Sequence, residues 1–379
     1  MTQQRQKTLG MIDNSKDLDR LVGRLSGEKV LAFDLEADSL HHYREKVCLI
    51  QIATEKAIFL VDPLAVTDIS SLGLLLSDPG IRKVFHGADY DIRSLHRDFS
   101  LEVRNLFDTM IACQLLGEKE VGLAAALKKR FGVELDKRYQ KADWSKRPLD
   151  PGMIAYAAGD TSLLVALYRQ LEAELAEKGR LAWAEEESDL LSEVRAADRE
   201  GEPLFYRFKG ASKMEPRTLA VLEELLRFRD LRARAADRPP FKVLSNETLR
   251  TLAEKKPKKP QDLQGIPGLT PRLVERYGRD ILKGVADACD LPEELLPGFT
   301  RAERPERDSL KDERLKKLKR WRVIKSLTLG IDAGILVNNA LLEILAKESP
   351  RDPSGLDAVT ALRGWRKREF GNELLKALN

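Results

Sequence analysis

The stretch that most constrains the fold is Val30-Leu31-Ala32-Phe33-Asp34-Leu35-Glu36-Ala37-Asp38, an apolar run that turns acidic. Its first four residues predict a buried strand, and such a strand should continue apolar. Asp34 and Glu36 follow instead, and residues two apart on a strand point to the same face of the sheet. Two carboxylates there repel each other and are costly to desolvate, whereas hard Mg²⁺ or Mn²⁺ binds carboxylate oxygens. The spacing alone more often marks a strand end in solvent, so a metal site requires further carboxylates.

Composition bounds the class of protein. The chain has 379 residues, enough for two or three domains, and its 42% hydrophobic content is sufficient for packed cores. It holds no apolar run of membrane-spanning length, and its N-terminus lacks the apolar core of a signal peptide. Cys48, Cys113 and Cys289 are scattered without zinc-binding spacing, which fits a reducing cytosol. We therefore expect a cytoplasmic protein with no membrane contact. A monomeric state and the absence of a tightly bound organic cofactor are further expectations, which composition does not decide.

The charge is distributed unevenly along the chain. Residues 1–200 contain 28 Lys and Arg against 34 Asp and Glu, whereas residues 201–379 contain 37 against 27. An acidic first half and a basic second half are typical of a catalytic part followed by a part that binds a polyanion. Solvated helix faces would explain the same charges equally well.

The order of elements in the first half predicts a mixed sheet of five strands with helices on its faces. Strands expected at 47–53 and 57–61 form an antiparallel meander with strand 30–37. From residue 80 onward, short strands at 83–86 and 106–107 are each followed by a helix, which favours parallel additions. The expected helices are 13–27, 69–76, 88–96, 109–116, 121–131, 151–176 and 182–199.

The second half predicts only helices. They are expected at 216–233, 245–253, from 263 onward, at 271–288 and at 310–327, with two or three more to the C-terminus. A first break follows Glu202-Pro203, with a connector over 204–214, and a second break, rich in charge and proline, covers 296–308. The two helical segments are similar in length and content, so they are interpreted as a diverged repeat.

The irregular stretch 135–149 interleaves basic residues with Tyr139 and Trp144. Basic side chains beside aromatic rings suit a nucleic-acid backbone and its stacked bases. A loop of ordinary solvated charges is the alternative.

Two further acidic positions come from helices. Asp91 would lie in the first turn of a helix, near the carboxyl end of a strand, where open sheets bind ligands. An acid at that position also stabilises the helix dipole. Tyr156 and Asp160 are four residues apart on a predicted helix and so share one face. Neither feature is specific when taken alone.

Together these residues resemble the three exonuclease motifs of the DEDD superfamily, in its Tyr-bearing subclass. The motifs are Asp34-x-Glu36, His86-Gly87-Ala88-x-x-Asp91 and Tyr156-x-x-x-Asp160. The surrounding Phe107-Asp108-Thr109 and Asp143-Trp144-x-x-Arg147-Pro148-Leu149 are similar to the ribonuclease D family and the exosome-associated 3′-5′ exonuclease. The resemblance implies a ribonuclease H-like α/β exonuclease domain over residues 1–205, and all-α HRDC domains over 212–292 and 308–379.

The resemblance also implies the roles of the site residues. One metal would be held by Asp34, Glu36 and Asp160, and a second by Asp34 and, through water, Asp91. Such a pair, either Mg²⁺ or Mn²⁺, stabilises the attacking and leaving oxygens of an in-line displacement. Tyr156 would orient the attacking water. Further substrate contacts are assigned to His86, Trp144 and Arg147, for each of which a structural role is the alternative.

The implied activity is a metal-dependent 3′-5′ exoribonuclease that trims RNA 3′ ends and releases nucleoside 5′-monophosphates. The implied partners are RNAs with a free 3′ end, such as tRNA precursors or other structured RNAs. The metal-binding carboxylates act on the phosphate and do not distinguish ribose from deoxyribose. A 3′-5′ DNA exonuclease is therefore an alternative. An RNA-binding scaffold with an idle nuclease domain is another.

Overall fold

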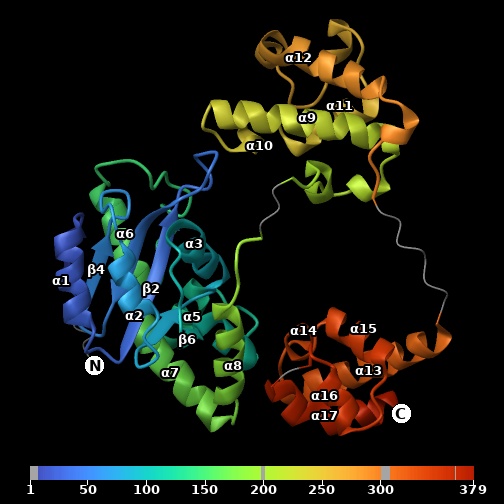
Figure 1. Ribbon diagram of the computed structural model, residues 1–379. Coiled ribbons are helices and arrows are strands. Elements are labelled where there is room, and N and C mark those ends of the chain that lie inside the picture. Colours follow the sequence, from blue (N-terminus) through green and yellow to red (C-terminus); the bar gives the residue numbers. More distant parts are fainter. Residues whose placement is uncertain (1–6, 198–200, 300–307, 363) are drawn as a thin grey trace. The chain divides into compact units, whose positions relative to one another are not determined.

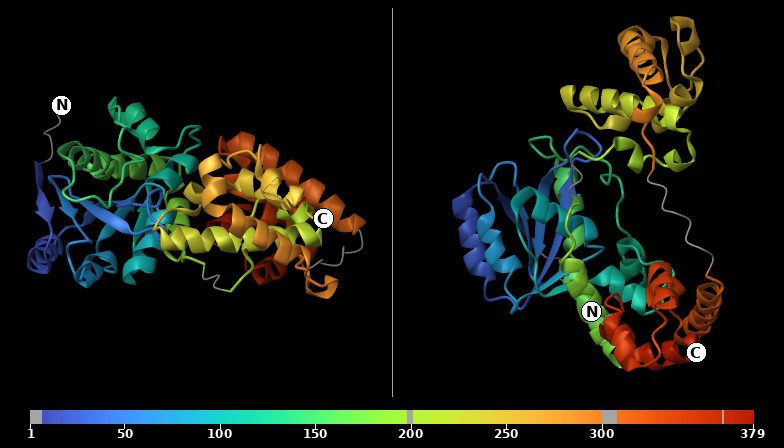
Figure 2. Two further views of the ribbon diagram at one scale, coloured as in Figure 1. Left: turned by 90° about the horizontal axis from the view of Figure 1, so that it is seen from above. Right: turned by 45° about the vertical axis from the view of Figure 1, so that its right-hand side comes forward.

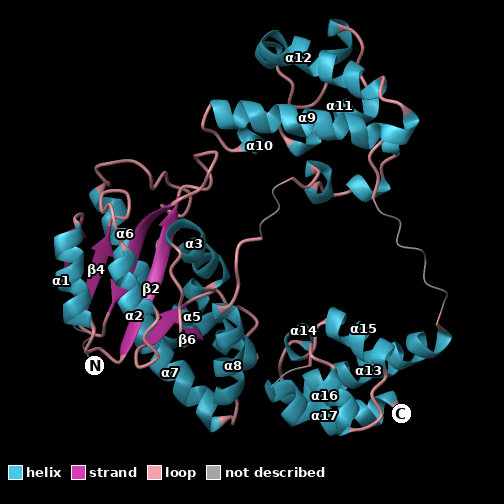
Figure 3. Ribbon diagram, viewed as in Figure 1, coloured by secondary structure: helices cyan, strands magenta, loops and turns pink. Residues whose placement is uncertain are grey.

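The computed structural model describes residues 7–197, 201–299, 308–362 and 364–379 (Figure 1). The chain divides into two compact units. The first unit comprises residues 1–37, 47–196 and 306–379, and the second comprises 38–46 and 197–305. Every strand of the described residues lies between Lys7 and Asp108, and the described residues beyond Asp108 form helices and loops (Figure 3).

The sheet has six strands in the order β1-β4-β3-β2-β5-β6. They are β1 (Lys7–Ile12), β2 (Val30–Ala37), β3 (Val47–Ala53), β4 (Ala57–Val61), β5 (Arg82–Phe85) and β6 (Leu106–Asp108). β3 is antiparallel to β2 and to β4, while β5 is parallel to β2 and β6 is parallel to β5. The predicted mixed sheet is confirmed, with β2 at its centre.

The predicted count of five strands is wrong, because β1 adds a sixth. β1 pairs with β4 in parallel at the edge of the sheet. Its sequence, KTLGMI, is short, and Gly10 and a register shift interrupt it. A strand with so few alternating apolar residues has no clear period in the sequence.

Helices cover both faces of the sheet. On one face, α1 (Ser15–Leu25) packs beside α2 (Gly73–Leu76), and α3 (Asp89–Phe99) joins their apolar core (Figure 2). A short 3₁₀ turn, η1 (Ser70–Leu72), leads into α2. The opposite face is covered by a second core, to which five helices that directly follow the sheet in the chain contribute. These are α4 (Thr109–Leu115), α5 (Leu123–Phe131), α6 (Pro151–Thr161), α7 (Leu164–Glu177) and α8 (Leu181–Ser192).

The single helix predicted over 151–176 is wrong, because the chain breaks between α6 and α7. Ser162 donates its hydroxyl to the carbonyl oxygen of Gly159 at 2.8 Å. Such local side-chain bonding competes with the regular helix ladder. The break separates α6 from the longer α7.

The first helical domain, residues 201–299, is organised around a long helix. Its helices are α9 (Pro216–Ala235), α10 (Pro240–Val243), α11 (Asn246–Lys255) and α12 (Pro271–Cys289). The helix expected from residue 263 onward is wrong, because Pro260–Leu263 is a 3₁₀ turn that ends there. The shorter 3₁₀ turns are Leu204–Arg207, Ala211–Lys213 and Glu293–Leu295.

The second helical domain, residues 308–379, repeats the same plan. Its helices are α13 (Ser309–Leu329), α14 (Ala333–Leu336), α15 (Asn339–Glu348), α16 (Pro353–Ala358) and α17 (Gly364–Leu378). In the first domain Arg229 donates to a carbonyl and to an Asn side chain that lie 15 and 17 residues onward. Arg322 makes the same two bonds at the same separations in the second domain. The repeat is thus visible in individual hydrogen bonds.

The two repeats differ in where they pack. The second helical domain belongs to the first compact unit and contributes Leu318, Trp365 and Phe370 to the same apolar core as α4–α8. The first helical domain has an apolar core of its own. Among the helices of the described ranges, none has both the length and the apolar composition of a membrane span.

Candidate active site

The central strand β2 supplies the first two carboxylates. Asp34 pairs with Gln51 of β3 and Glu36 pairs with Leu49, and the register shifts between Glu36 and Ala37, where the strand ends. Both side chains are partly buried, on the face of the sheet that α6 covers. The alternation predicted from the sequence therefore brings both acids to one face.

The third carboxylate comes from α6. Asp150 caps this helix by accepting from Gly152 N at 2.7 Å, and Pro151 occupies the first turn. The fully buried Ala157 lets α6 lie close against the sheet. As a result, one carboxylate oxygen from each of Asp34, Glu36 and Asp160 lies within 4.8 Å of the others.

Asp91 lies beside this cluster but is not part of it. It sits in the first turn of α3, only 7% exposed, just after the turn that joins β5 to α3. Gly87 makes that turn with a φ of +74°, a conformation that favours glycine. The charge of Asp91 raises the pKa of Asp34, so the two groups interact across the site. The structure thus brings three of the four predicted acids into one cluster, and Asp91 lies near enough to influence their charge.

Burial and mutual repulsion shift the titration of these acids. Burial, reinforced by the neighbouring carboxylates, raises the pKa of Asp34 well above its usual range and raises the pKa of Glu36 to about 9. Burial raises the pKa of Asp91 to about 7 and that of Asp160 to about 6. Acids in this arrangement resist ionisation unless a cation joins them. An all-oxygen donor set of this kind fits a hard divalent cation.

Tyr156 lies one helical turn before Asp160 on α6. Its ring contacts those of Tyr139 and Trp144, with centroids 5.9 and 6.0 Å away. Burial, together with the charge of Asp160, raises the pKa of the Tyr156 phenol. Burial raises the pKa of Asp160, and the nearby Tyr156 hydroxyl opposes this shift without cancelling it. The phenol therefore remains a neutral donor at the edge of the acidic cluster.

The three residues assigned to substrate contacts have partners inside the protein. Trp144 is 1% exposed and supports the ring of Tyr156. Arg147 forms an ion pair with Asp62 and donates to the carbonyl oxygens of Cys48, Trp144 and Lys146. His86 Nδ1 lies 2.9 Å from Thr109 Oγ1, and burial lowers the pKa of the imidazole. All three have structural roles here, and contact with a substrate stays a prediction.

Gln51, which was not predicted as a site residue, is fully buried next to Asp34 in the sheet. Neither polar atom of its amide has a hydrogen-bond partner within the described residues. The signal was available, since Gln51 is the one polar residue in the strand VCLIQIA. A buried amide on the face that carries the acids is a second sign that this part of the sheet is built for a polar ligand.

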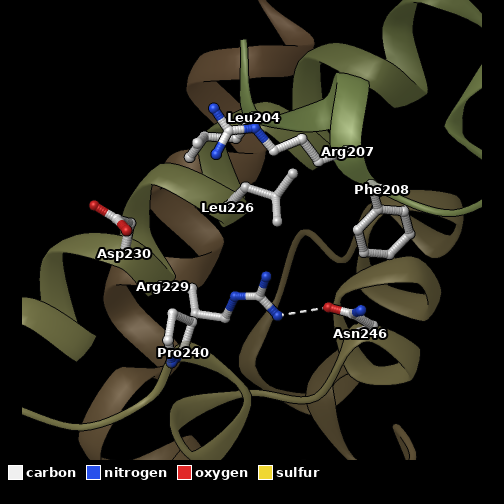
Figure 4. Close-up of a pocket in the computed structure, with 8 residues that line it drawn as sticks. All are labelled: Leu204, Arg207, Phe208, Leu226, Arg229, Asp230, Pro240 and Asn246. Carbon is white, nitrogen blue, oxygen red and sulfur yellow. Dashed lines mark hydrogen bonds between the residues drawn. The ribbon is translucent and has the colours of Figure 1, made fainter. Parts of the chain in front are cut away.

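A pocket of about 190 Å³ lies in the first helical domain (Figure 4). Arg229 donates to Asn246 Oδ1 at 2.7 Å across this pocket. Because Arg322 makes the same bond in the other repeat, this arginine fixes the fold of the domain. The lining residues are Leu204, Arg207, Phe208, Leu226, Arg229, Asp230, Pro240 and Asn246.

Comparison with known proteins identifies both parts of the chain. The 3′-5′ exonuclease family matches residues 9–176, and the HRDC domain family matches residues 218–285 and again 311–378. Ribonuclease D of Pseudomonas paraeruginosa is 32% identical over 355 residues, which cover 92% of each chain.

Solved structures agree with this result. Escherichia coli RNase D, described as an exoribonuclease involved in structured RNA processing, is 25% identical with a TM-score of 0.72, covering 97% of this chain and 98% of that one. The catalytic core of RRP6 from Trypanosoma brucei is 33% identical with a TM-score of 0.65, covering 76% of this chain and 83% of that one. The expected ribonuclease H-like fold followed by helical HRDC domains is therefore confirmed. The chain belongs to the ribonuclease D family of 3′-5′ exoribonucleases.

Proposed function

We propose that this exoribonuclease trims RNA 3′ ends by metal-dependent hydrolysis and releases nucleoside 5′-monophosphates. The observation that carries the proposal is the cluster of Asp34, Glu36 and Asp160 with Asp91 beside it. Four acids with raised pKa values are costly to keep in one place, so a role in binding cations explains their presence.

The residues fit two divalent cations, Mg²⁺ or Mn²⁺. Asp34, Glu36 and Asp160 would hold one, and Asp34 with Asp91 would hold the other. When bound, such ions neutralise the charge of a phosphodiester and favour ionisation of a nucleophilic water. In their absence, the raised pKa values leave part of the cluster protonated at neutral pH.

Tyr156 is assigned the task of orienting the attacking water. Its hydroxyl stays protonated, because burial and nearby acids raise its pKa. It can therefore donate to or accept from a water but cannot supply a negative charge. The contacts with Tyr139 and Trp144 hold the ring, so the hydroxyl has a fixed direction.

We assign tRNA precursors or other structured RNAs with a free 3′ end as substrates. The similarity to Escherichia coli RNase D supports this assignment. The excess of positive charge in residues 201–379 supports a further RNA contact outside the active site. Domain limits of 1–205, 212–292 and 308–379, a monomeric state and a cytoplasmic location stay predictions.

The test is digestion of matched RNA and DNA oligonucleotides with Mg²⁺ or Mn²⁺, followed by identification of the released nucleotides. Asp34→Asn, purified and shown to be folded, is the control for contaminating nucleases. We expect stepwise shortening of RNA from the 3′ end and release of 5′-monophosphates. Equal or faster digestion of DNA would favour the DNA exonuclease, and cleavage at internal bonds would contradict the proposal.

A further inference from the structure

We propose that the second HRDC domain positions the catalytic carboxylate Asp91, acting through α8 and Asp108. The inference rests on the proposed function, since it takes Asp91 as a metal-binding residue. The two HRDC domains would then have different roles, and the second would be a fixed structural part of the catalytic unit.

The first step joins α17 to α8. The rings of Trp365 and Trp183 stack, with centroids 4.3 Å apart and an angle of 13° between their planes. Trp365 N donates to both carboxylate oxygens of Glu186 at 3.0 and 2.9 Å, and its indole Nε1 donates to Glu187 at 2.8 Å. Glu186 thus caps the N-terminus of α17 from another domain, where a negative charge is favoured.

The contact requires a glycine. Gly364 begins α17 with a φ of +52°, and a Cβ placed there would lie 1.2 Å from Glu186 Oε1. Any other residue would displace the carboxylate from the helix end. A second attachment lies at Arg180, which donates to the carbonyl oxygen of Leu115 at the end of α4 and to that of Leu329 at the end of α13. Two independent contacts therefore fix the domain.

The second step joins α8 to Asp108. The backbone N of Asp108 donates to Ser188 Oγ at 3.1 Å, and both residues are fully buried. Buried polar groups of this kind are costly to leave unpaired. A shift of α8 would therefore be transmitted to Asp108.

The third step joins Asp108 to the start of α3. Its Oδ1 accepts from Gly87 N at 3.1 Å, and its Oδ2 accepts from Ala88 N at 2.7 Å. These two amides form the turn that leads directly into the helix carrying Asp91. A continuous series of contacts thus runs from α17 to the catalytic acid.

The competing interpretation is that the second HRDC domain serves only to bind RNA. In that case its attachment to the exonuclease needs no defined geometry. The stacked indoles, the capping carboxylate and the shared apolar core favour the positioning role.

The experiment uses two single variants of the full chain. Gly364→Ala breaks the contact between α17 and α8, and Ser188→Ala breaks the contact between α8 and Asp108. Asn338→Ala is the matched control, because it removes an N-cap inside the same domain without touching α8. Each variant is assayed for amide hydrogen exchange of residues 85–92, for Mn²⁺ affinity by calorimetry, and for RNA affinity.

We expect Gly364→Ala and Ser188→Ala to speed exchange in residues 85–92 and to weaken Mn²⁺ binding by about tenfold, a typical effect of removing a group that orients a ligand. The RNA affinity of both variants should stay within about twofold of the wild type. The Asn338→Ala control should likewise keep its exchange in residues 85–92 and its Mn²⁺ affinity within about twofold. Unchanged exchange in residues 85–92 of folded Gly364→Ala would overturn the proposal, as would lost RNA affinity with intact Mn²⁺ binding. Asp91→Asn separates the metal-binding role of Asp91 from its positioning by the second HRDC domain. If it leaves Mn²⁺ binding intact, the metal role of Asp91 fails, whereas the exchange data still report the positioning.

Discussion

Arg147 binds both carboxylate oxygens of Asp62, with Nε 2.5 Å from Oδ2 and Nη2 2.7 Å from Oδ1. Asp62 follows β4 and is 4% exposed, so this pair ties the irregular stretch 135–149 to the sheet. The same stretch carries Trp144, against which Tyr156 rests. The pair thus supports the active-site helix from outside the acidic cluster.

Arg147→Lys should therefore destabilise the protein. A lysine cannot donate two parallel bonds, so a buried carboxylate is left partly unpaired. We expect a loss of about 2–4 kcal/mol in the free energy of unfolding, measured by urea denaturation. Unchanged stability with weakened RNA binding would instead support the substrate contact expected for Arg147.

Asp34→Asn and Asp160→Asn should abolish cleavage while leaving the fold intact. Each removes a charged oxygen from the cluster but keeps the shape of the side chain. In the absence of metal the Asp160 variant should be more stable at pH 7 by about 2 kcal/mol, since burial raises the pKa of this carboxyl to about 6. Turnover close to the wild-type rate in a folded Asp34→Asn protein would refute the metal site.

The stability of the metal-free protein should fall as the pH rises from about 5 to 9. Glu36, Asp91 and Asp160 have raised pKa values of about 9, 7 and 6, so the folded state binds more protons than the unfolded state across this range. Their contribution is complete at low pH and is lost as each group ionises. Melting temperatures recorded with a chelator should show the slope, and added Mg²⁺ should remove it. An equal slope in Glu36→Gln/Asp160→Asn would assign it to other groups.

Tyr156→Phe should lower the single-turnover rate by about 10²- to 10⁴-fold, the usual range for a positioned hydrogen-bonding group. The change removes one hydroxyl and keeps the ring contacts with Tyr139 and Trp144. RNA and metal affinities should remain within a few-fold of the wild type. An unchanged rate with a lower melting temperature would show that Tyr156 is only a core residue.

Three exposed lysines of the first HRDC domain test its contact with RNA. Lys255, Lys258 and Lys259 lie at and after the end of α11, where their side chains face solvent. If each contacts a phosphate, their replacement by Gln should flatten the slope of log affinity against log salt by about 2. Lys16, Lys29 and Lys56 are also exposed, and their replacement gives the same change in net charge. Equal effects of the two triple variants would argue against a specific site.

The sequence predicted the centre of the sheet best. β2, β3 and β4 have the bounds expected from their apolar runs. These runs are apolar except at Asp34, Glu36 and Gln51, so their ends are easy to recognise. The four acids and Tyr156 were predicted from local spacing and from the family motifs that this spacing matches, and their roles stay predictions. β1 was not found, since its pairing with β4 depends on a contact about 50 residues away and not on its own pattern.

Long-range pairs account for most of what could not be predicted. The bond of Arg147 to Asp62 spans 85 residues, and nothing in either segment specifies the partner. Likewise, the second helical repeat packs on the exonuclease helices because Trp365 stacks on Trp183 of α8. Helical spacing places each indole on an apolar face, but it does not say which other face will cover it.

The chain leaves the first compact unit after residue 196 and returns to it at residue 306, with the first HRDC domain between. Trp365 and Glu186, which meet in this unit, are 179 residues apart in the chain. Closing so long a loop costs only modestly more entropy than closing a short one. It does, however, set an order of events during synthesis, because domains fold as units while the chain emerges. The first HRDC domain can complete its core while the exonuclease still lacks α17, so the unit that begins first is finished last.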